Sequence, residues 1–142
     1  MGAAQFLTKG WSILAKQDAE IFAAVDKLIA DCLNGRWEEF LAGYSADASL
    51  VCYGIAGRVE SRDEFRLLLA SWVTEHGFEM QTARSTERRV QYIGSAAVFT
   101  HVLETQFRFD GISDRKFERE TLVFEQIAGE WLCAHEHLSV NP

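Results

Sequence analysis

The sequence predicts an α+β domain in which helices come first and an antiparallel sheet follows. Apolar residues recur at helical spacing before Gly77, and the chain after Gly77 reads as strand. Short turn signals divide that second half into four adjacent runs, which is the pattern of an antiparallel meander. The chain has 142 residues, so we expect residues 1–142 to form a single domain.

The composition indicates a folded domain that binds neither nucleic acids nor membranes. Hydrophobic residues make up 48% of the chain, and a domain of this size buries about 70% of its unfolded surface. The net charge is −7, and no basic stripe of the kind that contacts phosphates is present. No run approaches the ~20 apolar residues that a membrane span needs.

The three cysteines, Cys32, Cys52 and Cys133, stand far apart among apolar neighbours. They form neither a Cys-x-x-Cys pair nor a ligand cluster, and this spacing is typical of reduced core thiols. The amino terminus also lacks the pattern of a signal peptide. We therefore expect a cytoplasmic protein.

The first half of the chain predicts two helices after an amino-terminal arm. Residues 1–11 are too apolar for a free tail, so we expect this arm to dock on the body or on a partner chain. A helix follows over residues 12–33, Asn34-Gly35 ends it, and a second short helix covers residues 37–44. The apolar face of the first helix consists of Ile21, Val25, Leu28, Ile29 and Cys32.

Two short strands, at residues 49–53 and 58–60, are expected before the third helix. Ser61-Arg-Asp-Glu64 then has the form of a capping box, in which the serine and glutamate side chains each bond a free amide of the first helical turn. The third helix begins there and ends near His76-Gly77.

The remaining strand runs are residues 78–93, 96–109, 117–127 and 130–139. The turn signals that separate them are Gly94-Ser95, the segment 110–114 and Ala128-Gly129.

Strict alternation sorts the strand side chains onto two faces. In the run 96–109, one face is strongly apolar and holds His101 between Phe99 and Leu103. We expect that face to line a pocket, together with Arg119 and Thr121 of the next run. In the last run, the residues expected toward the pocket are Trp131, Cys133, His135, His137 and Ser139, and those expected away from it are Leu132, Ala134, Glu136 and Leu138.

The outer face of the sheet also reads as apolar. It is expected to hold Val98, Val102, Leu122, Phe124, Leu132 and Leu138. A sheet that is wet on one side should instead alternate apolar with polar residues. Because the helices cover only one face, we expect a second copy to cover the other and form a homodimer.

Several segments follow one another in an order and at a spacing typical of one superfamily. They are Asn34-Gly35 before a Trp/Phe-rich helix, Gly57-Arg-Val-Glu60, Gly94-Ser-Ala-Ala97, Glu120-Thr121, Gly129-Glu-Trp131 and His135-Glu-His137-Leu-Ser139. In these features the chain resembles the nuclear transport factor 2-like superfamily. Within it, the chain is most similar to SnoaL-like proteins and to the association domain of calcium/calmodulin-dependent protein kinase II.

The resemblance implies a cone-shaped, cystatin-like fold, in which a bent sheet wraps around the long helix and leaves a pocket at its open end. Some relatives are enzymes, such as ketosteroid isomerase, scytalone dehydratase, limonene epoxide hydrolase and polyketide cyclases, and others bind ligands or assemble. The chain departs from two of these relatives. Steroid isomerases use a tyrosine in their oxyanion hole, and the first helix of this chain has no Tyr. The kinase association domain has Arg at two positions where this chain has Leu103 and Leu122.

Histidines are the candidate catalytic residues. His101, His135 and His137 titrate near neutrality and suit acid–base chemistry. The expected ligand-binding residues are Tyr53, Trp72, Phe99, His101, Arg119, Thr121, His135 and His137. Each has a plainer reading: core packing for the aromatics, solvation for the arginine, and structural hydrogen bonding for the histidines. We expect no metal and no cofactor.

Three functions remain open from the sequence. The leading one is a dimeric domain that binds a small, largely apolar molecule. The second is an isomerase, dehydratase or cyclase in which a pocket histidine moves the proton. The third is an assembly module without a ligand.

Overall fold

The computed structural model describes the backbone of residues 3–142 and the side chains of residues 13–142. The elements in chain order are α1 (Ala3–Leu33), α2 (Trp37–Ala42), β1 (Tyr44–Cys52), α3 (Arg62–His76), β2 (Glu79–Ile93), β3 (Ala96–Phe109), β4 (Ile112–Ile127) and β5 (Glu130–Val140).

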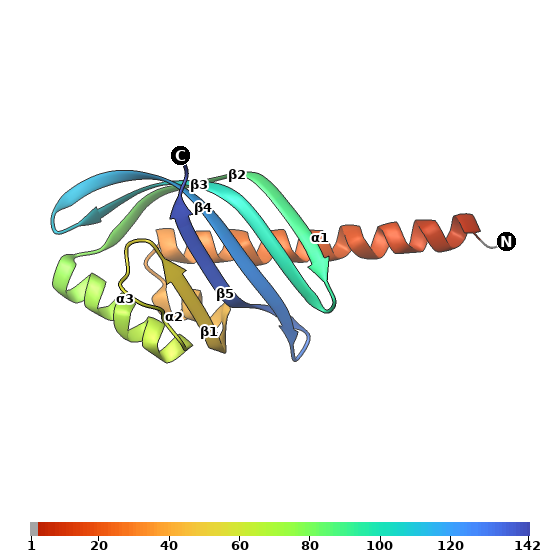
Figure 1. The fold of residues 1–142 in the computed structure, drawn as a ribbon, viewed down its shortest axis with the longest axis horizontal. Helices are drawn as coiled ribbons and strands as arrows, with labels where there is room; N and C mark the ends of the chain where they lie inside the picture. The colour runs from red at the N-terminus through yellow and green to blue at the C-terminus, as the bar shows by residue number, and fades with distance from the viewer. Residues whose placement is uncertain (1–2) are drawn as a thin grey trace.

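The strands form one sheet with the order β1-β5-β4-β3-β2. All neighbours are antiparallel except β1, which lies parallel to β5 at the edge. The sheet is strongly curved, and the helices lie on one side of it (Figure 1). Helix α1 packs against β2 and β5, and α3 packs against β1. The predicted α+β class, with helices on a curved sheet, is confirmed.

Two hairpins close through two-residue turns. Asp110 and Gly111 have φ values of 53° and 77°, and Ala128 and Gly129 have 52° and 81°. Positive φ at both central residues is the type I′ turn, whose twist matches that of the strands it joins. Because two residues suffice for the turn, β4 begins at Ile112, and the longer turn predicted over residues 110–114 is wrong.

Several element boundaries in the first half differ from the prediction. The backbone of α1 is already helical at Ala3, and the helix continues through Gly10 although glycine lowers helix propensity. The predicted docking of the arm over residues 1–11 concerns side chains outside the described residues. The predicted strand over residues 58–60 is reduced to one bridge between Val59 and Leu50.

The second helix ends at Ala42, and β1 begins at Tyr44, five residues earlier than predicted. Tyr44 is 2% exposed and pairs with Cys133, whose amide donates to the carbonyl of Gly43 at 2.8 Å. Burial of this aromatic ring against the sheet therefore outweighs the helical pattern of the segment.

The third helix begins as the sequence predicts. The Oγ atom of Ser61 accepts a hydrogen bond from the amide of Glu64 at 3.1 Å. The Glu64 carboxylate reaches back to the amide of Glu60 at 2.7 Å, one residue before the cap. At the other end, Gly77 caps the helix with φ 61°.

We expect Ser61→Ala to destabilise the protein by about 1 kcal/mol, because the first turn of α3 loses its side-chain acceptor. Urea denaturation should give this difference, and Ser61→Asp, which retains an acceptor, should stay near the native value. An alanine variant as stable as the native chain would contradict the capping role.

Candidate functional site

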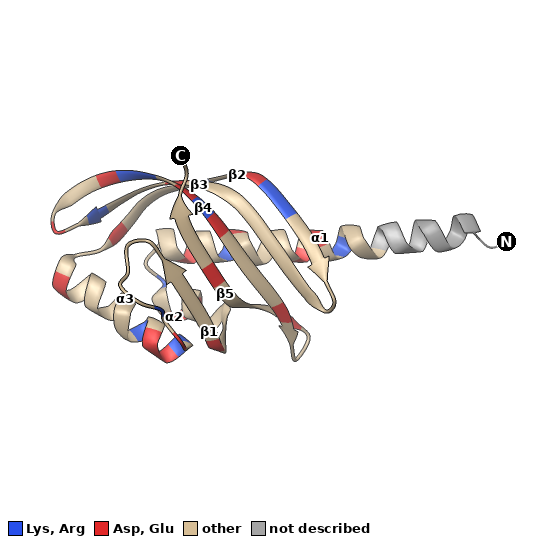
Figure 2. Ribbon diagram, in the orientation of Figure 1, with Lys and Arg blue, Asp and Glu red and all other residues tan. Residues whose placement is uncertain are grey.

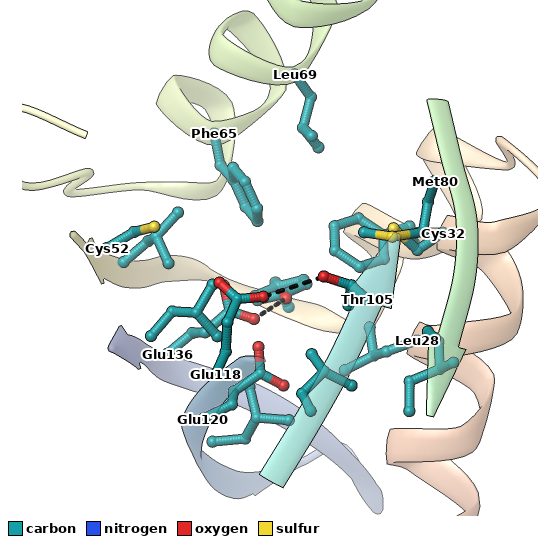
Figure 3. Close-up of a pocket in the computed structure, with 18 of the residues that line it drawn as sticks. Leu28, Cys32, Cys52, Phe65, Leu69, Met80, Thr105, Glu118, Glu120 and Glu136 are labelled. Atoms are coloured by element: carbon teal, nitrogen blue, oxygen red, sulfur yellow. Dashed lines mark hydrogen bonds between the residues drawn. The ribbon is translucent and has the colours of Figure 1, made fainter. Parts of the chain in front are cut away.

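A cavity of about 150 Å³ lies between the helices and the concave face of the sheet. Its walls are mostly apolar. The wall residues include Leu28 and Cys32 of α1, Phe65, Leu69 and Trp72 of α3, Met80 of β2, Leu103 of β3 and Leu138 of β5. Figure 3 shows Phe65 and Leu69 on one side of this space, opposite the strands.

Three glutamates project from the sheet into this cavity. Glu118 and Glu120 lie two apart on β4, so they share a face, and Glu136 comes from the adjacent β5. Glu118 is 5% and Glu136 is 9% exposed. Figure 2 shows acidic positions along the middle of β4 and β5, and Figure 3 shows the three carboxyl groups close together.

Hydroxyl groups bind two of the three carboxyls. The Tyr44 hydroxyl donates to Oε1 of Glu136 at 2.9 Å. The Tyr53 hydroxyl donates to Oε2 of Glu118 at 2.8 Å, and the Thr105 hydroxyl donates to Oε1 at 3.3 Å. Both oxygens of Glu118 are therefore occupied, which stabilises its charged form.

The third carboxyl, that of Glu120, bonds a buried histidine. His101 is 4% exposed, and its Nε2 lies 2.9 Å from Oε1 of Glu120. On the other side of the ring, Nδ1 lies 2.6 Å from the Ser85 hydroxyl. A neutral imidazole has one donor and one acceptor, so it bonds both neighbours in either tautomer. His101 can therefore stay bonded whether Glu120 is ionised or protonated.

Burial shifts the pKa values of these groups in the direction of their neutral forms. Desolvation raises the pKa of Glu120 to about 7, against a hydrogen bond with Glu136 that lowers it. Desolvation and the nearby Glu120 raise the pKa of Glu136 well above 4.5. Desolvation, followed by the charge of Arg88, lowers the pKa of His101 to about 4. Near pH 7, His101 is therefore neutral, and burial favours a protonated form of the carboxyl pair.

A second cavity of about 370 Å³ adjoins the first. The two share the wall residues Cys52, Ile55, Trp72, Phe78, Met80, Thr105, Glu118 and Leu138. The second is lined in addition by Tyr53, Phe107, Phe109 and Lys116. Tyr53 is 47% exposed, so this outer cavity lies near the surface. The deep cavity therefore adjoins a larger outer one.

The predicted orientation of the last strand is wrong beyond Cys133. The register shifts there: Phe124 pairs with Cys133 and Val123 with His135, so Ala134 is an extra residue. Such a bulge reverses the alternation of the strand that contains it. Cys133 still points inward, as predicted, but His135 and His137 lie on the outer face and Glu136 on the inner.

The predicted faces of β4 are also wrong, because Leu122 pairs with the inward-facing Phe99 of β3. Arg119 and Thr121 alternate with the inward-facing glutamates of β4, so they lie on the outer face and not at the pocket. Leu122, Phe124 and Leu138, which were expected on the outer face, lie on the inner one. On the outer face, Nδ1 of His135 lies 2.7 Å from the Ser49 hydroxyl.

The other predicted site residues divide into two groups. Trp72 lines both cavities and Tyr53 lines the outer one. Phe99 is fully buried in the core, and His101 reaches the site through Glu120. The sequence prediction missed the three glutamates and Tyr44. One signal could have found two of them, because Glu118 and Glu120 share their strand face with Leu122 and Phe124.

Two further findings concern the described residues only. No three His, Cys, Asp or Glu side chains are grouped there in a way that could hold a metal ion. None of the helices is both long enough and apolar enough to cross a membrane.

The cysteines are free, and desolvation raises the pKa of Cys32, at the cavity wall, to about 12.

Solved structures with the same fold share little sequence with this chain. A candidate scytalone dehydratase from Novosphingobium aromaticivorans has a TM-score of 0.77 at 13% identity, with 90% of this chain and 86% of that chain covered. A nuclear transport factor 2-like protein from Cytophaga hutchinsonii has 0.76 at 13%, covering 88% and 98%. The calcium/calmodulin-dependent kinase II hub homology domain of Chlamydomonas reinhardtii has 0.68 at 20%, covering 89% and 99%.

None of the curated protein sequences compared with the chain matches it. The family model described as the SnoaL-like domain matches residues 21–141, from the middle of α1 to the end of β5. That span includes the whole sheet and the three glutamates of the cavity. The chain therefore belongs to the SnoaL-like domain family.

Proposed function

We propose that this protein binds a small, largely apolar molecule in the cavity and that it does so as a homodimer. The observation that supports binding is the cavity itself, in which apolar walls surround one cluster of polar groups. Ligand pockets in proteins have this composition, because apolar walls supply affinity and a few polar groups fix orientation. A cavity of about 150 Å³ holds a molecule the size of benzene.

A second candidate function is acid–base catalysis of the isomerase, dehydratase or cyclase type. One observation favours it: desolvation brings the pKa of Glu120 to about 7, where a carboxylate is an effective general base. The group that moves the proton then differs from the histidine that the sequence predicts. His101 is neutral and holds Glu120 in place, so the carboxylate and not the imidazole takes the proton. A candidate scytalone dehydratase shares the fold, which is an analogy only.

The homodimer proposal rests on the outer face of the sheet. Its centre holds three half-buried valines, Val98, Val102 and Val123, which lie beside Thr100 and Thr121. No helix covers this face in Figure 1. A second copy would bury these valines, as a self-complementary interface does. The three free thiols support a reducing, cytoplasmic location as part of the same proposal.

Cyclohexanone and benzyl alcohol should raise the melting temperature of the full chain. A ligand at ten times its Kd stabilises the folded state by about 1.4 kcal/mol. The increase should be lost in Leu69→Phe, which fills the cavity wall, and kept in Leu67→Phe, whose side chain is 73% exposed on the same helix. If neither compound shifts the melting temperature, the result favours the third function, an assembly module without a ligand.

Catalysis should appear as exchange of the α-hydrogens of cyclohexanone for deuterium in D₂O, followed by NMR. The base must be ionised, so the protein-catalysed rate should rise as the pH rises through about 7. Glu120→Gln should reduce the rate at least about 100-fold, whereas Glu125→Gln, an exposed carboxyl on the same strand, should leave it unchanged. Exchange no faster than in buffer would remove the enzyme candidate.

Light scattering at micromolar concentration should give twice the chain mass of 16.1 kDa. Thr121→Arg should produce the monomer, because it places a charge at the centre of the outer face next to His137. Thr74→Arg, on the exposed side of α3, is the matched control and should remain a dimer. A native chain that is monomeric would contradict the proposal.

A further inference from the structure

We propose that the ligand of the cavity is a lipophilic amine, bound as its ammonium cation among Glu118, Glu120 and Glu136. The inference rests on the binding function proposed above and specifies the chemical class of the ligand. Its basis is the arrangement of charge, hydrogen-bond donors and aromatic rings around the deep cavity.

Charge is one-sided in the deep cavity. Among the described residues that line it, three are glutamates and none is Asp, Lys, Arg or His. An anionic ligand would therefore meet like charges without a countercharge, which costs binding energy. A cation would meet its countercharges inside an apolar enclosure, where their attraction is weakly screened.

One donor is missing within the carboxyl cluster. Tyr53 and Thr105 donate to both oxygens of Glu118, and Tyr44 donates to one oxygen of Glu136. Besides its bond to His101, Glu120 contacts Glu136, and these two carboxyl groups have no donor between them unless they retain a proton. An ammonium carries three N–H donors and can replace that proton.

Six aromatic rings form part of the wall. They are Trp37, Phe40, Tyr44, Phe65, Trp72 and Phe78. The face of such a ring attracts a cation, and the same rings bury an apolar body. The adjoining cavity of about 370 Å³ leaves room for substituents beyond a benzene-sized group. The pocket is therefore suited to a cationic head and a hydrophobic body together.

Binding should release the proton held by the carboxyl pair. The titratable groups around this pair come from five elements. They are Glu118 on β4, Tyr44 and Cys52 on β1, Cys133 on β5, Cys32 on α1 and His101 on β3, with the charge of Arg88 on β2 acting on His101. Glu118 is the ionisable neighbour of like charge. A neutral ligand would leave the proton in place, so proton release separates the two ligand classes.

The test is isothermal titration calorimetry of the full chain near pH 7 with benzylamine, benzyl alcohol and benzoate, which share one ring and differ in charge. We expect benzylamine to bind at least about tenfold more tightly than benzyl alcohol, and benzoate not to bind. The enthalpy for benzylamine should depend on the ionisation enthalpy of the buffer, and that for benzyl alcohol should not.

Matched variants locate the effect. Glu136→Gln and Glu120→Gln should each reduce the affinity for benzylamine at least about tenfold, and a cooperative thermal unfolding transition shows that each variant is folded. Glu125→Gln, exposed on the same strand as Glu120, should behave as the native chain.

Two results would overturn the inference in different ways. If benzyl alcohol binds as tightly as benzylamine, or benzoate binds most tightly, the amine inference is wrong and the binding function stands. If none of the three compounds binds, and neither cyclohexanone nor benzyl alcohol shifts the melting temperature, the binding function is wrong and the inference falls with it.

Discussion

The extra residue at Ala134 determines which side chains of β5 face the cavity. Without that bulge, the inward position of Cys133 would continue to His135 and His137, and the cavity would hold imidazoles in place of Glu136. With it, Glu136 and Leu138 face inward. The bulge also aligns Glu136 with Leu122 of β4, diagonal to Glu120, which brings the two carboxyls together. The bulge therefore adds the third carboxyl of the pocket, that of Glu136, to the two that β4 supplies.

Burial of three carboxyl groups in an apolar enclosure is costly unless each is hydrogen-bonded or neutral. The surrounding residues meet this requirement in two ways. Glu118 receives two hydroxyl donors and lines the outer cavity as well, whereas Glu120 and Glu136 each have one such partner, His101 and Tyr44, and burial raises their pKa values toward the neutral form. A stable core alone would be served as well by apolar residues of similar size. The proposed contact with a ligand would account for their presence at the cavity.

The sequence was a good guide to the architecture, because architecture depends on periodicity over long segments. Helix α3 with its Ser61 cap, the long strands and the glycine turns all follow from local patterns. The site was harder to predict, because it depends on the phase of each strand. A bulge leaves no distinct signal in the letters Cys133-Ala-His135, so strict alternation placed both histidines inside. Tyr44 was missed for a related reason: its pairing with Cys133 is a tertiary contact between distant segments.

The two candidate chemistries of the pocket use the same proton. In an acid–base enzyme, Glu120 would exchange it with a carbon acid while His101 switches tautomer to remain bonded. In an amine-binding protein, an ammonium would displace that proton and both carboxylates would become ionised. An amine at the cavity should therefore inhibit any exchange of cyclohexanone α-hydrogens by competing for the carboxylate base. Such competition would place both activities at Glu120 and Glu136, the adjacent carboxyl groups whose pKa values burial raises.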